Sequence, residues 1–391
     1  MLETILPQEM LTICQPCHDE EGRKYYYIRI SDGKSWLFPC ASSRLLKLAL
    51  AIYQPVGLRG WGFKLMFPYL ASNRVFRRFI GSFMRVAIVD VSLRVEFTEW
   101  IHEVFQVKEP ILSFYMGYPN IIRKSTCQVG DRELNILGYA KFSNESTGCE
   151  MIGVEAGFLG LYGDGKAGIP HRLAFRTDLL GLTILAQTTI KTLHDSRKSN
   201  ILSQQHMEFL QQLRDKTKLT INYQSTGYYL NQQNYLATVL TNSTPENGEI
   251  IRVAADIINS RLGDREVTFS TAHRDFKPPN ICIVAGRIMV FDWELVAYEY
   301  PPFYDIFSFV TFGWRTAGMS AEKIWDAAEN YMADLVIRYT DFTQETLELY
   351  YLMYQLDTTL LSLSLNPEAP IHNELRLIKE ITKSLRGGSG F

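Results

Sequence analysis

The sequence predicts an α+β fold, because strand-like segments come first along the chain and helical segments follow them. The chain has 391 residues. A single hydrophobic core stops growing near about 250–300 residues, so we expect more than one packed unit. Apolar residues make up 46% and charged residues 21% of the chain. This is ordinary globular usage and excludes a disordered chain.

The charge is unevenly spread. The formal net charge is −2, which excludes a uniformly basic nucleic-acid-binding protein. Residues 33–89 contain nine Lys and Arg and no acidic residue, so they carry +9 while the rest of the chain carries 31 − 42 = −11. Aromatic residues alternate with these cations, among them Trp61, Phe67 and Tyr69. We therefore expect residues 1–105 to form an extra N-terminal module.

This basic and aromatic stretch allows two interpretations. It can hold the protein at the surface of an anionic membrane or engage a polyanionic substrate. Alternatively, its aromatic residues pack into a core while its arginines stay in solvent. The helical spacing of Phe76, Phe79 and Phe83 favours the packed core.

Residues 106–190 are expected to be rich in strands, with one helix. Alternation of side chains and bounding turns predict strands over Ile111–Met116, Lys124–Val129, Asn135–Phe142, Arg172–Arg176 and Leu180–Ile190, and a helix over Cys149–Tyr162. Residues 191–391 are expected to be mostly helical, over Ser203–Lys216, Glu246–Arg261, Ala321–Arg338 and Gln344–Ser364. One hairpin interrupts them, with strands Ile281–Val284 and Ile288–Phe291 around Ala285-Gly286.

The segment His273-Arg274-Asp275-Phe276-Lys277-Pro278-Pro279-Asn280 carries the chemistry. Asp275 and Asn280 are five residues apart in a loop stiffened by proline, so both side chains can face one cleft. The hairpin that follows can return Asp292 to the same place. One carboxylate can then accept a proton from a hydroxyl group, while a carboxylate and an amide oxygen hold a hard cation. Phosphoryl transfer uses such a set, because it depends on positioning and on charge neutralisation by Mg²⁺.

These residues resemble the catalytic segment of the kinase-like superfamily, most closely its aminoglycoside phosphotransferase and choline kinase branch. That branch has His-Gly-Asp-x-x-x-x-Asn, then Asp-Trp-Glu, then Pro-Pro-x-x-Asp. This chain has the loop above, Asp292-Trp293-Glu294 and Pro301-Pro302-Phe303-Tyr304-Asp305 in the same order. The resemblance implies a bilobal protein-kinase-like fold, with an N-lobe over residues 106–190 and a helical C-lobe over residues 191–391. It also implies roles: Asp275 as catalytic base, Asn280 and Asp292 as Mg²⁺ ligands, and His273 and Asp305 as supports of the loop.

The nucleotide-binding half is implied less directly. The resemblance calls for a strand lysine that contacts the α- and β-phosphates of ATP and pairs with a helix glutamate. Lys141 is the candidate lysine and Glu155 the candidate glutamate, with Glu150 as its rival. The phosphate-covering turn would begin at Gly117, but it supplies only one glycine where the related kinases have three. The backbone segment that binds adenine would lie near Gln187-Thr188-Thr189.

Position 274 is a second departure from the small-molecule kinases, whereas the region after Asp292 argues against a protein kinase. Arg274 stands where they have glycine, and with Lys277 it makes the loop similar to the His-Arg-Asp-x-Lys-Pro-x-Asn of protein kinases. Lys277 would then support the γ-phosphate; its alternative role is that of a surface cation or of a cation that stabilises the loop. Only twelve residues separate Asp292 from Asp305, which leaves no room for a typical activation segment.

We therefore expect an ATP- and Mg²⁺-dependent phosphotransferase acting on a hydroxyl group of a small molecule. The combination of Asp-Trp-Glu with Pro-Pro-x-x-Asp resembles members associated with cell-envelope polysaccharides, so a sugar or saccharide is the favoured acceptor. An atypical protein kinase and an inactive nucleotide-binding scaffold are the alternatives. No apolar run of about 18 residues and no export signal occur in the sequence. We expect a cytoplasmic protein, with peripheral contact at the inner face of a membrane through residues 33–89 as the further option.

Overall fold

The computed structural model describes residues 11–14, 23–29, 33–53, 57–73, 86–117, 124–165, 168–192 and 201–387. Two compact units make up the chain, residues 1–198 with 282–294, and residues 199–281 with 295–391. An antiparallel sheet dominates the first unit and helices dominate the second, so the expected α+β class is confirmed. The expected boundaries at residues 105 and 190 stay a prediction.

The first unit is built on a nine-stranded antiparallel sheet in the order β1-β4-β2-β3-β5-β6-β7-β9-β8. Its strands are β1 (Leu11–Cys14), β2 (Arg23–Arg29), β3 (Ser35–Pro39), β4 (Val86–Leu93), β5 (Ile111–Met116), β6 (Ser125–Gly130), β7 (Ile136–Ser143), β8 (Arg172–Leu179) and β9 (Leu182–Thr188). The strands of the first 105 residues continue the same sheet, because β3 pairs with β5 through Leu37 and Phe114. This pairing satisfies backbone groups that an open sheet edge would expose.

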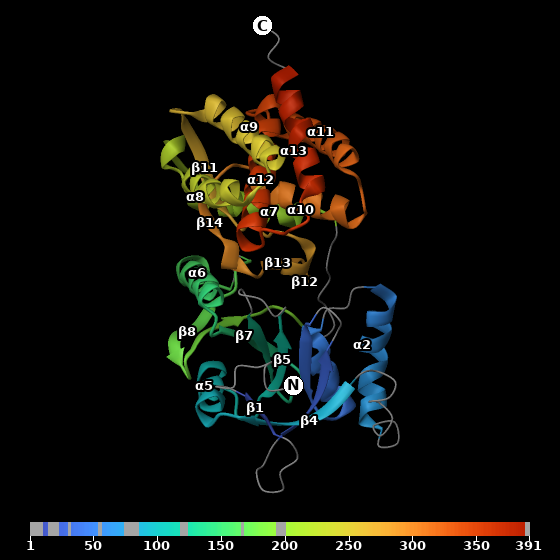
Figure 1. Ribbon diagram of the computed structural model, residues 1–391. Helices are drawn as coiled ribbons and strands as arrows, with labels where there is room; N and C mark the ends of the chain where they lie inside the picture. Colours follow the sequence, from blue (N-terminus) through green and yellow to red (C-terminus); the bar gives the residue numbers. More distant parts are fainter. Residues whose placement is uncertain are drawn as a thin grey trace. The chain divides into compact units, whose positions relative to one another are not determined.

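Helices cover both faces of this sheet. The helix α5 (Val95–Phe105) covers one face, while α2 (Gly57–Ser72) and α6 (Ser146–Tyr162) lie on the other; all three are labelled in Figure 1. The place of α6 follows from Glu155, which pairs with Lys141, the strand neighbour of Ala140. Phe97 and Trp100 of α5 pack with Phe114 and Ala140 in one core cluster. The neighbours of Ala140 on β7 point to the opposite face, where Tyr139 packs near Leu48 of α1 (Ser43–Ala49).

The second unit is a helical assembly around α12 (Gln344–Leu365). This helix is buried on nearly all sides and has thirteen buried residues, as expected for a helix inside a core. Around it pack α8 (Gly227–Asn242), α9 (Pro245–Leu262), α10 (Tyr304–Thr316), α11 (Ala321–Arg338) and α13 (His372–Gly387), as Figure 1 shows. The remaining elements are α7 (Gln204–Thr217) and the three-stranded sheet of β10 (Leu219–Asn222), β11 (Glu266–Ala272) and β14 (Ala297–Tyr300).

Two strand predictions near turns can be compared with the structure. The hairpin β12 (Ile281–Val284) and β13 (Arg287–Val290) is confirmed, with φ of 48° at Ala285 and 77° at Gly286, as a tight two-residue turn requires. The strand expected over Leu180–Ile190 is wrong at its start. Leu180 and Gly181 form a turn with φ of 57° and 72°, so β9 begins at Leu182.

Four elements of the second unit were not predicted: α8, α10, α13 and the three-stranded sheet. The sequence of α8 is rich in Asn, Gln and Tyr and shows little apolar contrast between its faces. By contrast, α13 is clearly amphipathic, with buried Leu375, Ile378, Ile381 and Leu385 at helical spacing, and that signal was present in the sequence. Within the described residues, no helix combines the length and the apolar character needed to cross a membrane.

The close packing of β7 against β9 yields a stability prediction. A Cβ atom at Gly138 would lie 2.2 Å from the carbonyl oxygen of Gln187 and 2.8 Å from the Phe105 ring. We expect Gly138→Ala to lower the free energy of unfolding by about 2 kcal/mol or more, because backbone atoms must move to admit the methyl group. Urea unfolding followed by circular dichroism measures this change.

Gly153 offers a matched control. It lies within α6, and a Cβ atom there would meet nothing within 4 Å. Gly153→Ala should stabilise the chain by about 0.5–1 kcal/mol, because alanine favours the helix. Equal unfolding midpoints for the two variants would contradict the close approach of β7 and β9.

Candidate functional site

The side chain of Lys141 forms a buried ion pair with Glu155. Lys141 lies on β7 and Glu155 on α6, and the ammonium donates to the two carboxylate oxygens at 2.9 and 2.8 Å. The Glu155 side chain is fully buried. Burial opposes the charge of Lys141, but Asp292, Glu155 and Glu294 outweigh it and raise its pKa. Lys141 therefore stays an ammonium, the form that can bind phosphate.

Asp292 joins this pair within the same unit. Its carboxylate also accepts from the Lys141 ammonium. The backbone of Asp292 has a φ of 66°, a left-handed conformation that is rare outside glycine and turns the chain sharply after β13. The next residue fixes this turn: the Trp293 ring stacks on Phe158 of α6 at 4.2 Å, and its backbone N–H donates to Glu155 at 3.4 Å.

A second lysine–glutamate pair, which the sequence does not predict, lies beside Asp292. The ammonium of Lys124 contacts the carboxylate of Glu294, two residues after Asp292. Lys124 lies just before β6 and opposite the end of β5, because its carbonyl accepts the N–H of Gly117 at 3.1 Å. Burial raises the pKa of Glu294, and Asp292 adds to this effect. The motif Asp292-Trp293-Glu294 contained the glutamate, but nothing in the sequence linked it to Lys124.

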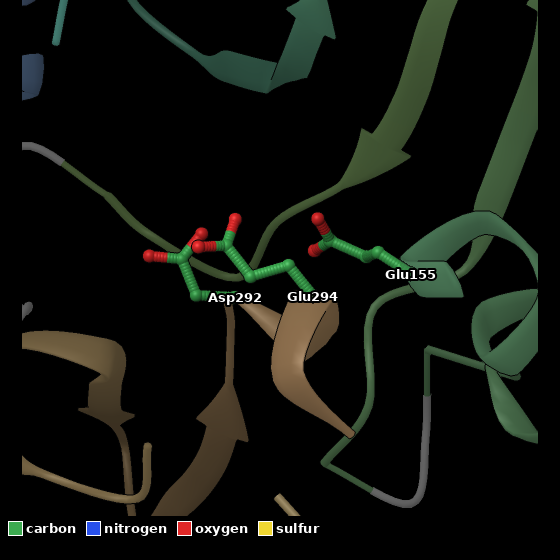
Figure 2. A group of neighbouring side chains, drawn as sticks. All are labelled: Glu155, Asp292 and Glu294. Carbon is green, nitrogen blue, oxygen red and sulfur yellow. The ribbon is translucent and has the colours of Figure 1, made fainter. Parts of the chain in front are cut away.

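Three carboxylates therefore meet beside the two lysines. Figure 2 shows Glu155 reaching from α6 toward Asp292 and Glu294, which come from the segment after β13. Each residue offers one oxygen atom, and these oxygens all lie within 4.8 Å of one another. Carboxylate oxygens are the ligands preferred by Mg²⁺. This donor set fits a hard divalent cation.

The expected adenine-binding segment lies at the end of β9. Gln187 is buried and pairs across the sheet with Tyr139, and within the described residues neither the Gln187 side-chain oxygen nor the Tyr139 hydroxyl has a hydrogen-bond partner. The Thr188 hydroxyl accepts the backbone N–H of His171 at 2.9 Å, and the Thr189 hydroxyl accepts the backbone N–H of Lys191 at 3.0 Å. The residues of the turn after Gly117, from 118 to 123, lie outside the described residues.

Lys191 is a further residue near this segment that the sequence does not predict. Its ammonium lies 5.1 Å from the centre of the Tyr139 ring and 4.6 Å from that of Phe291. Burial lowers the pKa of Lys191, and the charge of Lys141 adds to this effect. A lysine placed over two aromatic rings gives no pattern in a single sequence.

The loop from His273 to Asn280 belongs to the second unit. Both carboxylate oxygens of Asp275 are engaged: Asn280 donates from its amide at 2.7 Å, and the Lys277 ammonium lies at 2.5 Å. The Asn280 amide nitrogen also donates to the Asp275 carbonyl at 3.0 Å. Both bonds use the nitrogen, so the amide oxygen is available to a different kind of partner, such as a cation. His273 is fully buried, and its ring nitrogen Nδ1 accepts the backbone N–H of Asp275 at 3.2 Å.

Asp305 holds the start of this loop. It lies in the first turn of α10, and its two oxygens accept the backbone N–H groups of His273 at 2.8 Å and of Arg274 at 3.0 Å. Burial raises the pKa of Asp305 to about 7, although the two N–H groups act in the opposite direction.

Arg274 has a structural explanation. Its φ is 65°, in the left-handed region that favours the glycine expected at this position. Its guanidinium forms a buried bidentate ion pair with Asp357 of α12, with nitrogen–oxygen distances of 2.9–3.1 Å. Asp357 also accepts from the hydroxyl groups of Tyr300 at 3.3 Å and Tyr304 at 2.5 Å. Because the side chain is buried in this network, Arg274 does not by itself favour a protein kinase.

The predicted residues thus form two groups. Lys141, Glu155 and Asp292 meet in the first unit, and Glu150 instead contacts Ser146 on the surface of α6. His273, Asp275, Lys277, Asn280 and Asp305 meet in the second unit. The convergence of Asp275, Asn280 and Asp292 around one cation stays a prediction.

Solved structures similar to this chain are small-molecule kinases. Aminoglycoside phosphotransferase APH(4)-Ia has 15% identity and a TM-score of 0.48, over 74% of this chain and 98% of its own. A thermostable mutant of the same enzyme, in a ternary complex with ADP and hygromycin B, has 16% identity and a TM-score of 0.47, over 76% and 99%. Choline kinase LicA from Streptococcus pneumoniae has 14% identity and a TM-score of 0.48, over 74% and 98%. No family model and no curated protein matches the chain.

The raised pKa of Asp305 predicts a pH dependence of stability. Its folded pKa of about 7 lies above the ordinary value of 3.8, so the folded chain keeps a proton that the unfolded chain has released. Its contribution to the free energy of unfolding is full below about pH 4 and is lost as the pH rises through about 7, by up to about 4 kcal/mol.

Urea unfolding from pH 4 to pH 8 tests this dependence. The stability of the wild type relative to Asp305→Asn should fall across this range, because the variant has no carboxyl group to titrate. The exposed Asp326→Asn on α11 is the control and should show no such trend. A constant difference between wild type and Asp305→Asn would contradict the raised pKa.

Proposed function

We propose that this protein is an ATP- and Mg²⁺-dependent phosphotransferase that phosphorylates a hydroxyl group of a small molecule. The observation that carries the proposal is the buried contact of Lys141 with both Glu155 and Asp292. A lysine from a strand, a glutamate from the next helix and an aspartate from a distant hairpin meet in one unit, as phosphoryl transfer by a kinase-like enzyme requires.

Lys141 would bind the α- and β-phosphates of ATP. Glu155 fixes the ammonium through both carboxylate oxygens, so little conformational freedom remains to be lost on binding. Asn280 and Asp292 are the proposed ligands of Mg²⁺, which would neutralise charge on the transferred phosphoryl group. Glu294 lies close enough to Asp292 to add a further oxygen.

Asp275 would accept the proton of the acceptor hydroxyl. The Asn280 amide and the Lys277 ammonium fix its carboxylate, while His273 fixes its backbone. Such positioning supplies much of the rate enhancement in a reaction where the attacking oxygen must be in line with the leaving group. Lys277 is the proposed contact of the γ-phosphate.

The proposed acceptor is a sugar or saccharide of cell-envelope polysaccharide metabolism. The support is the sequence combination of Asp292-Trp293-Glu294 with the Pro-Pro-x-x-Asp motif that ends at Asp305. Peripheral membrane contact is a separate proposal, because it rests on the N-terminal residues and not on these side chains.

The second candidate is an inactive nucleotide-binding scaffold. The observation in its favour is the sequence from Gly117, which supplies only one glycine where the phosphate-covering turn of the related kinases has three. Both candidates bind ATP, so both predict a higher melting temperature with MgATP. Only the enzyme predicts phosphate transfer.

Replacing the proposed base separates the two candidates. We expect the wild type to consume ATP in the presence of one class among sugars, amino alcohols, nucleosides and aminoglycosides. Asp275→Asn should lower kcat by at least about a hundredfold, because the proton acceptor is lost, while MgATP still raises the melting temperature. Absence of turnover in the wild type against the whole panel would favour the scaffold, and transfer to added protein would favour an atypical protein kinase.

The two lysines should differ in their effect on nucleotide use. Lys141→Met should lower kcat/KM for ATP by at least about a hundredfold, because a preorganised charge is lost. Lys124 lies beside the same carboxylates through Glu294 and is the proposed second phosphate contact. Lys124→Met should therefore raise KM for ATP about tenfold, the cost of one charge-assisted contact. Steady-state kinetics at saturating acceptor measures both values.

The exposed Lys383→Met on α13 is the control for loss of a positive charge. An unchanged KM for ATP in Lys124→Met would mean that Lys124 pairs with Glu294 but does not contact phosphate. Wild-type kinetics in Lys141→Met would contradict the proposed phosphate contact.

A further inference from the structure

The helix α2 presents an apolar surface to solvent. The described part of the chain has fourteen large exposed hydrophobic residues, and four of them lie in one nine-residue stretch of this helix. They are Trp61, Leu65, Met66 and Tyr69, and their exposed fractions are 52%, 65%, 57% and 58%. Their spacing of four, one and three residues places them on one helix face.

The opposite face of α2 is firmly packed, so the exposed face has a fixed orientation. Phe67 and Ala71 are fully buried. The Phe67 ring stacks on Phe63 at 4.7 Å and meets the Tyr26 ring of β2 edge-on at 5.3 Å. The Tyr26 hydroxyl donates to the Ala71 carbonyl at 2.8 Å. Phe63 and Phe67 therefore pack into the core, but Trp61 and Tyr69 do not. Phe76, Phe79 and Phe83, for which the packed core was expected, lie outside the described residues.

Positive charge surrounds this apolar face. Arg44 and Lys47 of α1 and Arg59 of α2 are exposed. The Lys47 ammonium donates to the Tyr69 hydroxyl at 2.6 Å and lies 4.4 Å from the centre of its ring. No acidic residue occurs between residues 33 and 89 to offset these charges.

We propose that the exposed face of α2 docks on an anionic lipid surface. Trp61, Leu65, Met66 and Tyr69 enter the boundary between headgroups and acyl chains, and Arg44, Lys47 and Arg59 contact lipid phosphates. Tryptophan and tyrosine favour this boundary, because one part of each ring system is apolar and the other binds water. An interfacial helix gains from both the buried apolar area and the attraction to anionic lipid.

The charge around the exposed face of α2 favours an anionic lipid surface over a second copy of the chain as its partner. A twofold dimer through α2 would bring the same cations of both copies together, and residues 33–89 contain no carboxylate to pair them. The remainder of the chain carries −11 against +9 for residues 33–89, so an anionic surface attracts this region and repels the rest. The docking proposal does not depend on the phosphotransferase proposal.

Co-sedimentation of the full chain with vesicles tests the proposal. Vesicles of phosphatidylcholine with about 30% phosphatidylglycerol should bind the wild type at least tenfold more tightly than pure phosphatidylcholine vesicles at 0.1 M salt. Raising the salt to 0.5 M should weaken this binding, because the cations are then screened.

Two variants identify the surface. Trp61→Ser combined with Leu65→Ser and Met66→Ser should weaken binding at least tenfold and leave the melting temperature within a few degrees of the wild type, because these side chains are exposed. Arg44→Gln combined with Lys47→Gln and Arg59→Gln should abolish the preference for anionic vesicles. The matched control replaces exposed apolar residues elsewhere, Leu161→Ser, Leu230→Ser and Ile337→Ser, and should bind as the wild type does.

Three outcomes would overturn the proposal. One is a wild type that binds neither kind of vesicle. Another is equal vesicle binding by the wild type and the α2 variant. The third is a wild-type dimer in sedimentation velocity that the α2 variant lacks, since the face then serves a second copy.

Discussion

The first unit depends on one interaction, the ion pairing of the buried Lys141 ammonium. A charge removed from water must be paired, and here two carboxylates from distant parts of the sequence supply the pairing. This requirement ties α6 and the Asp292 segment to β7. The stack of Trp293 on Phe158 adds apolar area to the same join, so packing and electrostatics favour one arrangement.

The second unit holds its polar loop in a different way. Asp305 accepts two backbone N–H groups, and the Arg274–Asp357 pair anchors the loop to α12. These contacts keep Arg274 in a left-handed conformation that costs free energy for any residue but glycine. Strained residues of this kind cluster at functional sites, and Asp292 has the same conformation in the first unit.

The sequence predicts residues that stand in the order of a known motif. Through the resemblance to the kinase-like superfamily it indicates Lys141, Glu155 and Asp292, and it favours Glu155 over Glu150. It could not find Lys124 or Lys191, because their partners are far away in the sequence and a single chain carries no record of such contacts. Nor could it divide the aromatic residues of α2 into buried and exposed, since the helical pattern there is apolar on several sides.

The pairing of Arg274 with Asp357 also constrains how related sequences can vary. A glycine at position 274 would relieve the left-handed backbone but would leave the Asp357 carboxylate buried with only tyrosine hydroxyls as partners. An uncharged residue at position 357 would in turn leave the Arg274 guanidinium buried without a charged partner. The two positions should therefore co-vary across homologues: arginine with aspartate, or glycine with a neutral side chain.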